Sequence, residues 1–320
     1  MAKPIFQVKK TGLFTTYQDL GRWGYQQFGV PVSGAMDPFA LQVGNLLVGN
    51  NANEAAIEMT MIGPELLVLS DHIVAITGAD LDAKLNGNSV PLWQAVKIRE
   101  GDTLTFTSPR KGVRAYLAVA GGVNIPMIMG SKSTYVKARI GTLIQKGDVI
   151  DGFSIEHSHT SVGLSYQSRP KHNQVVTVRI ILGPHDHQFT DKGIRTFFES
   201  EYVVKQADRM GYRLEGDTPL EHKGGADIIS DTVPFGGIQV PLNGQPIILM
   251  ADRQTTGGYA RIGTIITADI PKVSQLPPGG KIRFQPITVE EAETLLKQEQ
   301  RLLSCLKVGV RNRQVPDRAR

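Results

Sequence analysis

Residues 251–263, ADRQTTGGYARIG, gather several polar groups that can bind an anion within one short stretch of the chain. Arginine presents a rigid fork of N–H donors that matches a carboxylate or a phosphate, and glycine lets a backbone approach a ligand closely. A ligand pocket is therefore one interpretation of this stretch. The other is a polar turn between two strands, in which Asp252 pairs with an arginine and Gly257 and Gly258 only reverse the chain.

The pocket interpretation gives each polar residue of this stretch a role. Asp252 and Arg253 would frame the pocket, while Tyr259 and Arg261 would complete it. Hydrogen bonds to a carboxylate, phosphate or amide oxygen would come from the side chains and backbone of Thr255, Thr256, Gly257 and Gly258. Removing one preorganised donor of this kind costs on the order of 3 kcal/mol of transition-state stabilisation. Asp252 and Arg261 are the candidate catalytic residues, and the others are candidate binding residues.

A second cluster with similar chemistry lies near the N-terminus. QDLGRWGY at residues 18–25 and QADRMGY at residues 206–212 both combine Gln, Asp, Arg and Gly-Tyr, and AVKIREGDTLTF in the first half resembles KVSQLPPGGKIRF in the second. These echoes indicate that a β-rich unit was duplicated, and ligand sites often lie where two domains meet. Asp19 and Arg22 would then form either an ion-paired turn or the opposite wall of the pocket.

Several familiar catalytic and nucleotide-binding patterns are missing. MGSKST at residues 129–134 lacks the G-x-x-x-x-G-K-[ST] order of a phosphate-binding loop, and no G-x-S-x-G nucleophile motif occurs. His185 and His187 would share one face of a strand, but no third ligand matches them, so we predict no metal site. The single cysteine, Cys305, cannot form an internal disulfide and is expected in an apolar core. Chemistry by this chain is therefore expected to require partner chains.

The composition is that of a soluble, folded protein. The 320 residues are 41% hydrophobic, enough for a sizeable core, and the net charge of +5 comes from 35 basic and 30 acidic residues that are interspersed. No basic stripe for nucleic acid results, and no stretch reaches the roughly 20 apolar residues that span a bilayer. Because the N-terminal residues also lack a secretory pattern, we expect a cytoplasmic protein that binds neither nucleic acid nor membrane.

Short apolar runs separated by Gly, Pro and Asn-Gly signals predict a mainly β protein with a few helices. One helix is expected after Asp37, with Pro38 at its first position. A second is expected after Thr288, which forms a capping box with Glu291, and a third around residues 186–200.

Polar and turn residues replace the apolar runs near the middle of the chain, where HSHTSVGLSYQSRPKHN indicates a linker. We therefore predict an N-terminal subdomain at residues 1–157, a linker at 158–173, a C-terminal subdomain at 174–310 and a basic tail at 311–320.

Six motifs, spread over residues 12–284, carry a resemblance to a known family. They are TTYQDLGRWGYQQFGVPVSGAMD, LVGNNANEAAIE, GSKSTY, ADRMGYRLEG, GGIQVPLNGQPIILMADRQTTGGYARIG and LPPGGKIRF. The chain resembles the biotin-dependent carboxyltransferase family, which includes allophanate hydrolase subunit 2, the carboxyltransferase portion of urea carboxylase, and the C subunit of 5-oxoprolinase, the antagonist of the Kip kinase inhibitor. The resemblance implies two cyclophilin-like β-barrel subdomains and a separately encoded partner, the B subunit.

Among the family's activities, the resemblance points first to the C subunit of an ATP-dependent 5-oxoprolinase, a hydrolase subunit that is inactive alone. It would act with the B subunit, which shares the ATP, to activate the lactam of 5-oxoproline, and the A subunit would open the ring to glutamate. One alternative is the carboxyltransferase subunit of a urea carboxylase-like system, with biotin as cofactor. Another is a regulatory protein that sequesters a sporulation kinase inhibitor.

Two features depart from the family pattern. The segment STYVKARIGTLIQKGD, residues 133–148, is shorter than the glycine-rich segment usual in the family. The family also favours a polar amide where this chain has His185.

Overall fold

The computed structural model describes residues 1–153 and 162–314, which divide into two compact units. The first unit comprises Met1–Arg22, Asp37–Lys171 and Gln300–Arg320, and the second comprises Trp23–Met36 and His172–Glu299. A short N-terminal segment thus groups with the second unit. The predicted linker at 158–173 and the predicted tail at 311–320 both extend outside the described residues, and residues 311–314 continue a helix.

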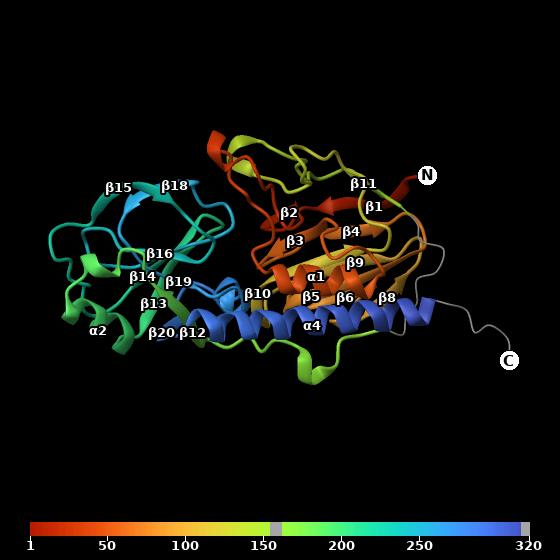
Figure 1. Cartoon of the computed structure of the whole chain (residues 1–320). Helices are drawn as coiled ribbons and strands as arrows, with labels where there is room; N and C mark the ends of the chain where they lie inside the picture. Colours follow the sequence, from red (N-terminus) through yellow and green to blue (C-terminus); the bar gives the residue numbers. More distant parts are fainter. Residues whose placement is uncertain (154–161, 315–320) are drawn as a thin grey trace. The chain divides into compact units, whose positions relative to one another are not determined.

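The first unit is built from two sheets (Figure 1). The six-stranded sheet has the order β11-β1-β4-β9-β6-β7, and the five-stranded sheet has the order β2-β3-β10-β5-β8. The strands are β1 Lys3–Lys10, β2 Phe14–Gln18, β3 Ala56–Thr60, β4 Glu65–Val68, β5 His72–Asp80, β6 Ala83–Leu85, β7 Asn88–Ser89, β8 Ala95–Ile98, β9 Thr103–Phe106, β10 Lys111–Val119 and β11 Val149–Gly152. All the pairings within these two sheets are antiparallel.

Side chains from both sheets form one buried apolar core in the first unit, with Ile5, Ile57 and Leu117 among its fully buried members. Helix α1, Pro38–Leu47, covers β5 and β10. Its start confirms the sequence prediction, because the Asp37 side chain accepts a hydrogen bond from the Ala40 backbone N–H and Pro38 occupies the first turn.

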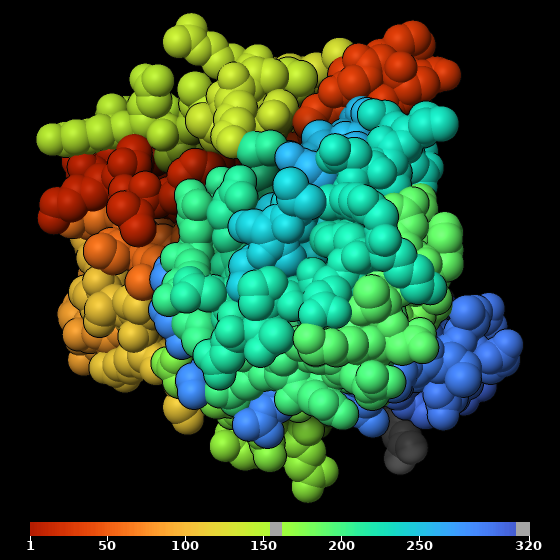
Figure 2. All heavy atoms as spheres, turned by 90° about the vertical axis from the view of Figure 1, so that its left-hand side faces the viewer, coloured from red at the N-terminus to blue at the C-terminus, as the bar shows by residue number. Residues whose placement is uncertain are grey.

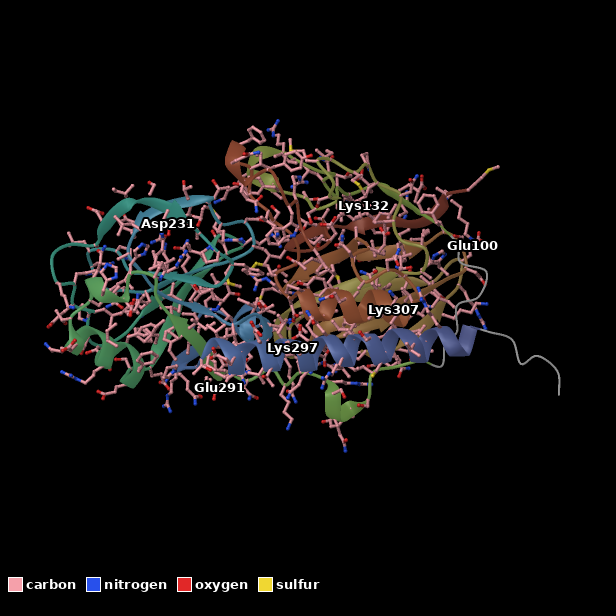
Figure 3. All side chains as sticks on the ribbon, viewed as in Figure 1. Glu100, Lys132, Asp231, Glu291, Lys297 and Lys307 are labelled. Atoms are coloured by element: carbon pink, nitrogen blue, oxygen red, sulfur yellow. The ribbon has the colours of Figure 1, made fainter. Side chains whose placement is uncertain are left out.

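The second unit contains a closed barrel with the strand order β12-β19-β16-β17-β14-β13-β20. A separate two-stranded ribbon pairs β15 with β18, and Figure 3 labels Asp231 on this ribbon. The strands of this unit are β12 Val175–Leu182, β13 Tyr202–Ala207, β14 Gly211–Glu215, β15 Asp227–Thr232, β16 Gly237–Gln239, β17 Ile247–Leu249, β18 Thr256–Tyr259, β19 Arg261–Ile265 and β20 Lys281–Pro286.

The barrel core follows from alternation along its strands. In β12, Val176, Val178 and Ile180 are buried, because residues two apart in a strand face the same side. They join a cluster that includes Phe197 and Phe284, whose rings stack with centroids 4.5 Å apart. The mainly β fold with few helices is thus confirmed, and the closed barrel supplies the rigid frame on which the candidate site is built.

The remaining helices are short except for the last one. The predicted helix near 186–200 is present as the 3-10 turn η4, Asp186–Gln188, followed by α2, Asp191–Glu199. The other elements are α3 Ile270–Ser274, α4 Val289–Gln314, η1 Gln26–Phe28, η2 Val136–Ala138, η3 Tyr166–Ser168 and η5 Thr267–Asp269.

Helix α4 confirms one prediction and corrects another. The Thr288 backbone N–H donates to Glu291, and the Glu291 N–H donates back to the Thr288 hydroxyl, which is the predicted capping box. Cys305, which was expected in an apolar core, is exposed instead. In this part of the helix the buried residue is Val310, which lies on a different face from Cys305. Among the described residues, no helix is both long and apolar enough to cross a membrane.

Candidate functional site

The polar stretch at 251–263 does not form one continuous loop. Its first residues are irregular, Thr256–Tyr259 form strand β18, and Arg261–Ile265 form strand β19 of the barrel. Gly257 and Gly258 therefore lie in a strand, and the alternative in which they make a tight turn is wrong. A Cβ on Gly257 would lie 2.4 Å from Nε2 of Gln239, whereas a Cβ on Gly258 would meet nothing closer than 3.7 Å. Only at the first glycine would a side chain force a neighbour, the end of Gln239, to move.

Asp252 forms a buried, two-pronged ion pair with Arg209. Its Oδ2 accepts from Nε of Arg209 and its Oδ1 accepts from Nη2, both at 2.9 Å. Nη2 also donates to the carbonyl of Gly34 at 2.7 Å. The side chains of Arg209 and Asp252 are only 7% and 9% exposed. Asp252 thus pairs with an arginine from outside its own stretch, at the start of strand β14.

Arg253, which directly follows Asp252, is also buried. Its Nε donates to the carbonyl of Val233 at 2.8 Å, and its guanidinium carbon lies 5.5 Å from the centre of the Phe235 ring. Burial lowers the pKa of Arg253 to about 10, while the charge of Asp252 opposes that shift. The side chain therefore remains cationic at neutral pH and anchors the turn to the segment between β15 and β16.

Arg261 has a looser environment than Arg253, the other arginine of the stretch. Its Nη1 donates to the carbonyl of Thr232 at 2.7 Å, and its Nη2 lies 3.7 Å from Oδ2 of Asp231. The arginine side chain is 13% exposed, against 43% for the aspartate. Its Nε is buried without a hydrogen-bond partner in the described structure. Burial lowers the pKa of Arg261, and Asp231 partly opposes this.

The end of strand β12 brings His185 to Arg261. The backbone N–H of Arg261 donates to Nδ1 of His185 at 3.2 Å, and the His185 N–H donates to the Arg261 carbonyl at 3.1 Å. Burial lowers the pKa of His185, and the nearby positive charge of Arg261 lowers it further. The His187 ring is centred 6.4 Å from that of His185. No group of three or more potential metal ligands occurs within residues 1–153 and 162–314.

The remaining predicted residues of the stretch lie along the ribbon. Thr256 is exposed and faces Thr232 across β15 and β18, while the Thr255 carbonyl accepts from the Val233 N–H at 3.1 Å. Tyr259 is 42% exposed, and its carbonyl accepts from the buried Gln239 side chain at 3.4 Å. In Figure 2, segments of this unit, coloured cyan to light blue, form much of the visible surface.

Asp19 and Arg22 belong to the first unit, where a buried network uses their polar atoms. Oδ1 of Asp19 accepts from the Gly21 N–H and from the hydroxyls of Ser131 and Ser133, at 2.8, 2.7 and 2.5 Å, and Oδ2 accepts from the Lys132 N–H at 2.7 Å. The Arg22 side chain is fully buried and donates to the Ser133 carbonyl at 2.8 Å. This network fixes the GSKSTY segment, and Figure 3 labels Lys132 within it.

A surface pocket of about 590 Å³ also lies in the first unit. Its walls include Lys10, Glu65, Phe106 and Lys146. None of the predicted site residues lines it. Size alone therefore does not connect this pocket with the chemistry of the stretch at 251–263.

In the second unit, seven of the predicted residues lie on the β15–β18 ribbon or next to it, where strand β19 of the barrel begins. We call this region the edge. The seven residues are Arg253, Thr255, Thr256, Gly257, Gly258, Tyr259 and Arg261. Sequence reasoning missed two residues that shape this edge, Asp231 and Gln239, and it considered a third, His185, only as half of a metal pair and as a departure from the family pattern. Only His185 had a sequence signal, in its departure from the expected amide. Chemically, the edge offers a guanidinium with incompletely used donors beside a half-buried imidazole, which suits an anion or a carbonyl oxygen that gains negative charge.

Comparisons with known proteins agree with the fold and extend over most of the chain. Residues 28–286 match the family described as carboxyltransferase domain, subdomain A and B. The 5-oxoprolinase C subunit from Escherichia coli (strain K12) is 38% identical over 317 residues, covering 96% of this chain and 99% of that protein. Its namesake from Haemophilus influenzae is 34% identical, covering 91% of this chain and 94% of that protein.

The same fold occurs in larger enzymes. The crystal structure of the Kluyveromyces lactis urea amidolyase superimposes with a TM-score of 0.86 at 28% identity. The match covers 95% of this chain but only 20% of the amidolyase chain.

Proposed function

The chain belongs to the family of carboxyltransferase domains with subdomains A and B, and from this premise we propose that it is the C subunit of an ATP-dependent 5-oxoprolinase. The observation that carries the proposal is the match over 99% of the length of the Escherichia coli 5-oxoprolinase C subunit. The urea amidolyase of Lachancea kluyveri is 30% identical, but the match covers only 18% of that protein.

The proposed substrate, 5-oxoproline, presents a lactam whose carbonyl oxygen gains negative charge when it reacts. In the proposed reaction that oxygen attacks the γ-phosphorus of ATP, the new O–P bond forms, and ADP leaves. Water then adds to the activated carbon, and the ring C–N bond breaks as the nitrogen takes a proton, which leaves an acyl phosphate. A second water attacks this acyl phosphate, its C–O bond to the phosphate breaks, and phosphate is released. Glutamate, ADP and phosphate result. We assign the ATP contacts to a surface shared with the B subunit, and we assign the ring opening to the A subunit.

This chain's proposed contribution is to bind and orient the lactam through the edge around Arg261. The Arg261 guanidinium uses one donor on the Thr232 carbonyl and lies 3.7 Å from Asp231, so it keeps donor capacity for a ligand oxygen. Thr255, Thr256 and Tyr259 supply further polar groups along the ribbon. Arg253 and Asp252 hold the turn, since both side chains are almost fully buried.

A second candidate function is the carboxyltransferase subunit of a biotin-dependent urea carboxylase-like system. The structural similarity to the Kluyveromyces lactis urea carboxylase, with a TM-score of 0.85, favours it. Biotin's ureido ring and the lactam of 5-oxoproline both place an N–H beside a carbonyl in a five-membered ring. One set of donors could therefore serve either substrate, with biotin as the cofactor under this alternative.

Reconstitution separates these functions. The purified chain alone should show no ATP-dependent opening of 5-oxoproline, and activity should appear when the B and A subunits are added. A complex with the B subunit should elute as one species in size-exclusion chromatography. Robust turnover by the chain alone would contradict the proposal. Absence of turnover with all three subunits, together with biotin-dependent carboxylation of urea in the presence of a biotin carboxylase, would favour the alternative.

A further inference from the structure

His185 takes the place of a backbone acceptor where strand β19 begins. Between β12 and β19 the antiparallel ladder pairs Leu182 with Gly263, and just beyond it the Gly183 N–H donates to the Ile262 carbonyl at 3.0 Å. At the next position the His185 N–H donates to the Arg261 carbonyl, but the returning bond from the Arg261 N–H goes to the His185 side chain. Nδ1 of His185 therefore takes the place of a backbone carbonyl as the acceptor for the Arg261 N–H, at the end of the β12–β19 ladder.

This hydrogen bond fixes the protonation state of the imidazole. Nδ1 can accept from the Arg261 N–H only when it carries no proton, so the neutral ring must hold its proton on Nε2. A second proton on the ring would convert Nδ1 into a donor that faces another donor. The hydrogen bond at the start of β19 would then be lost.

We propose that His185 is a positioning residue for Arg261, which it holds through Nδ1 only while the imidazole is neutral. The inference deepens the proposed function, because it names the group that keeps the substrate-binding arginine in place, and to that extent it rests on that function. Protonation of the ring removes one of the two hydrogen bonds between His185 and Arg261 and so loosens the start of β19, while the His185 N–H still donates to the Arg261 carbonyl. The guanidinium, which donates to the Thr232 carbonyl, is then positioned less firmly.

The charges around the ring come from three elements. Arg261 on β19 and His187 on η4 disfavour the imidazolium, whereas Asp231 on β15 and Asp186 on η4 favour it. Burial and the arginine prevail, so the pKa of His185 is lowered from its ordinary value of 6.5. The neutral, accepting form therefore persists to a lower pH than it would for a solvated histidine. The hold on Arg261 is complete above that pH and is lost as the pH falls through the lowered pKa.

Two simpler roles for His185 fit less well. A metal pair with His187 would need at least one further ligand, and none gathers there within the described residues. A purely packed histidine would need no defined tautomer, whereas here one ring nitrogen accepts from the Arg261 backbone.

The direct test uses the full-length chain alone, labelled with ¹⁵N, and follows the imidazole nitrogens and the Arg261 amide by NMR from pH 8 to pH 5. His185→Gln assigns the ring signals, and His187→Gln is the matched control in the same turn. We expect Nδ1 to be unprotonated at pH 8, the His185 titration midpoint to lie below 6.5, and the Arg261 amide shift to follow that midpoint. A proton on Nδ1 at pH 8, or an Arg261 amide that ignores the titration, would overturn the inference.

The second measurement is the pH profile of 5-oxoproline-dependent ATP turnover in the reconstituted complex. Turnover should fall on the acidic side in the native complex and in His187→Gln. His185→Asn places an amide oxygen at the position of Nδ1, and an amide oxygen accepts at every pH. This variant should therefore keep activity within about twofold at pH 8 and lose the part of the acidic fall that His185 causes. His185→Ala should be about tenfold slower at pH 8. An unchanged acidic fall in His185→Asn would contradict the inference.

The two measurements separate this inference from the proposed function. A native complex with no lactam-dependent turnover at any pH contradicts the proposed function, while the NMR titration of the chain alone still decides whether His185 holds Arg261. Normal turnover together with an Arg261 amide that ignores His185 contradicts the inference and leaves the proposed function intact.

Discussion

Two arginine–aspartate pairs in the second unit use the same chemical groups in opposite ways. Arg209 and Asp252 meet through two hydrogen bonds of 2.9 Å, and both side chains are less than one tenth exposed. Arg261 and Asp231 make one contact of 3.7 Å, and the aspartate is 43% exposed. A tight, buried pair satisfies its own charges within the fold. A loose pair leaves donor capacity on the arginine, which the proposed function assigns to a ligand oxygen.

Burial explains why the difference matters energetically. A buried ion pair gains little over an apolar replacement, but removing one partner strands a charge in the interior at a cost of about 3–5 kcal/mol. A partly exposed pair is screened by water and contributes about 0–1 kcal/mol. The buried pair, Arg209 and Asp252, therefore stabilises the fold. The loose pair, Arg261 and Asp231, contributes little to stability.

The largest expected effect comes from breaking the buried pair. Asp252→Ala should lower the free energy of unfolding by about 3–5 kcal/mol, because Arg209 stays buried without its carboxylate. Denaturant unfolding of the purified chain measures this. The double variant Arg209→Met/Asp252→Leu should recover part of the loss, since no charge is then stranded. If the single variant unfolds like the native chain, the pair does not carry the role given to it.

The Asp19 network in the first unit should rank next. Asp19→Ala leaves the N–H groups of Gly21 and Lys132 and the hydroxyls of Ser131 and Ser133 without their acceptor, which should cost about 2–3 kcal/mol. Ser131→Ala removes one donor to Asp19 and the hydroxyl that accepts from the Ser133 N–H, and it should cost about 1–2 kcal/mol, less than Asp19→Ala. Thermal and denaturant unfolding report both values. Equal effects of the two variants would show that the carboxylate is not the centre of this network.

The two glycines of β18 offer a matched pair with a smaller effect. Gly257→Ala should cost about 1–2 kcal/mol, because its Cβ would lie 2.4 Å from Gln239 and push that side chain off the Tyr259 carbonyl. Gly258→Ala, whose Cβ would make only ordinary van der Waals contacts, should stay within about 0.5 kcal/mol. Unfolding curves of the two variants make the comparison. The opposite order would contradict the packing described for this strand.

The smallest effect is expected at the loose pair. Asp231→Ala should change the free energy of unfolding by about 0–1 kcal/mol, because its contact with Arg261 is long and partly solvated. The same denaturation assay used for Asp252→Ala measures it side by side. A loss as large as that of Asp252→Ala would remove the distinction between the two pairs.

Local patterns predict the elements better than the contacts. The caps of α1 and α4 can be predicted, since Asp37 and Thr288 act on backbone groups three residues away. The sequence also suggests that Asp252 pairs with an arginine, but it does not identify the partner. Arg209 reaches it because strands β14 and β17 pair, with Gly211 opposite Leu249, and such long-range register is absent from any local pattern.

The sequence suggests some residues of the candidate site but not their arrangement. Asp252 and Arg261 are expected to act together as catalytic groups, yet the first lies in a buried pair and the second lies at the ribbon. The Arg261 side chain is also only 13% exposed, although it carries the charge expected of a surface residue. The hydrogen bond from its backbone to His185 depends on where the β12–β19 ladder stops, which only the fold determines.

We propose that Arg261 acts on the ligand while the buried arginines hold the frame. The most direct test measures 5-oxoproline-dependent ATP turnover and unfolding in parallel for Arg261→Ala and Arg261→Lys, in the complex with the B and A subunits. We predict that Arg261→Ala lowers turnover about 100-fold while the folded complex still assembles, and that lysine restores little of it because the guanidinium fork is lost. Full turnover in both variants, or a loss that only follows unfolding of the chain, would contradict the claim.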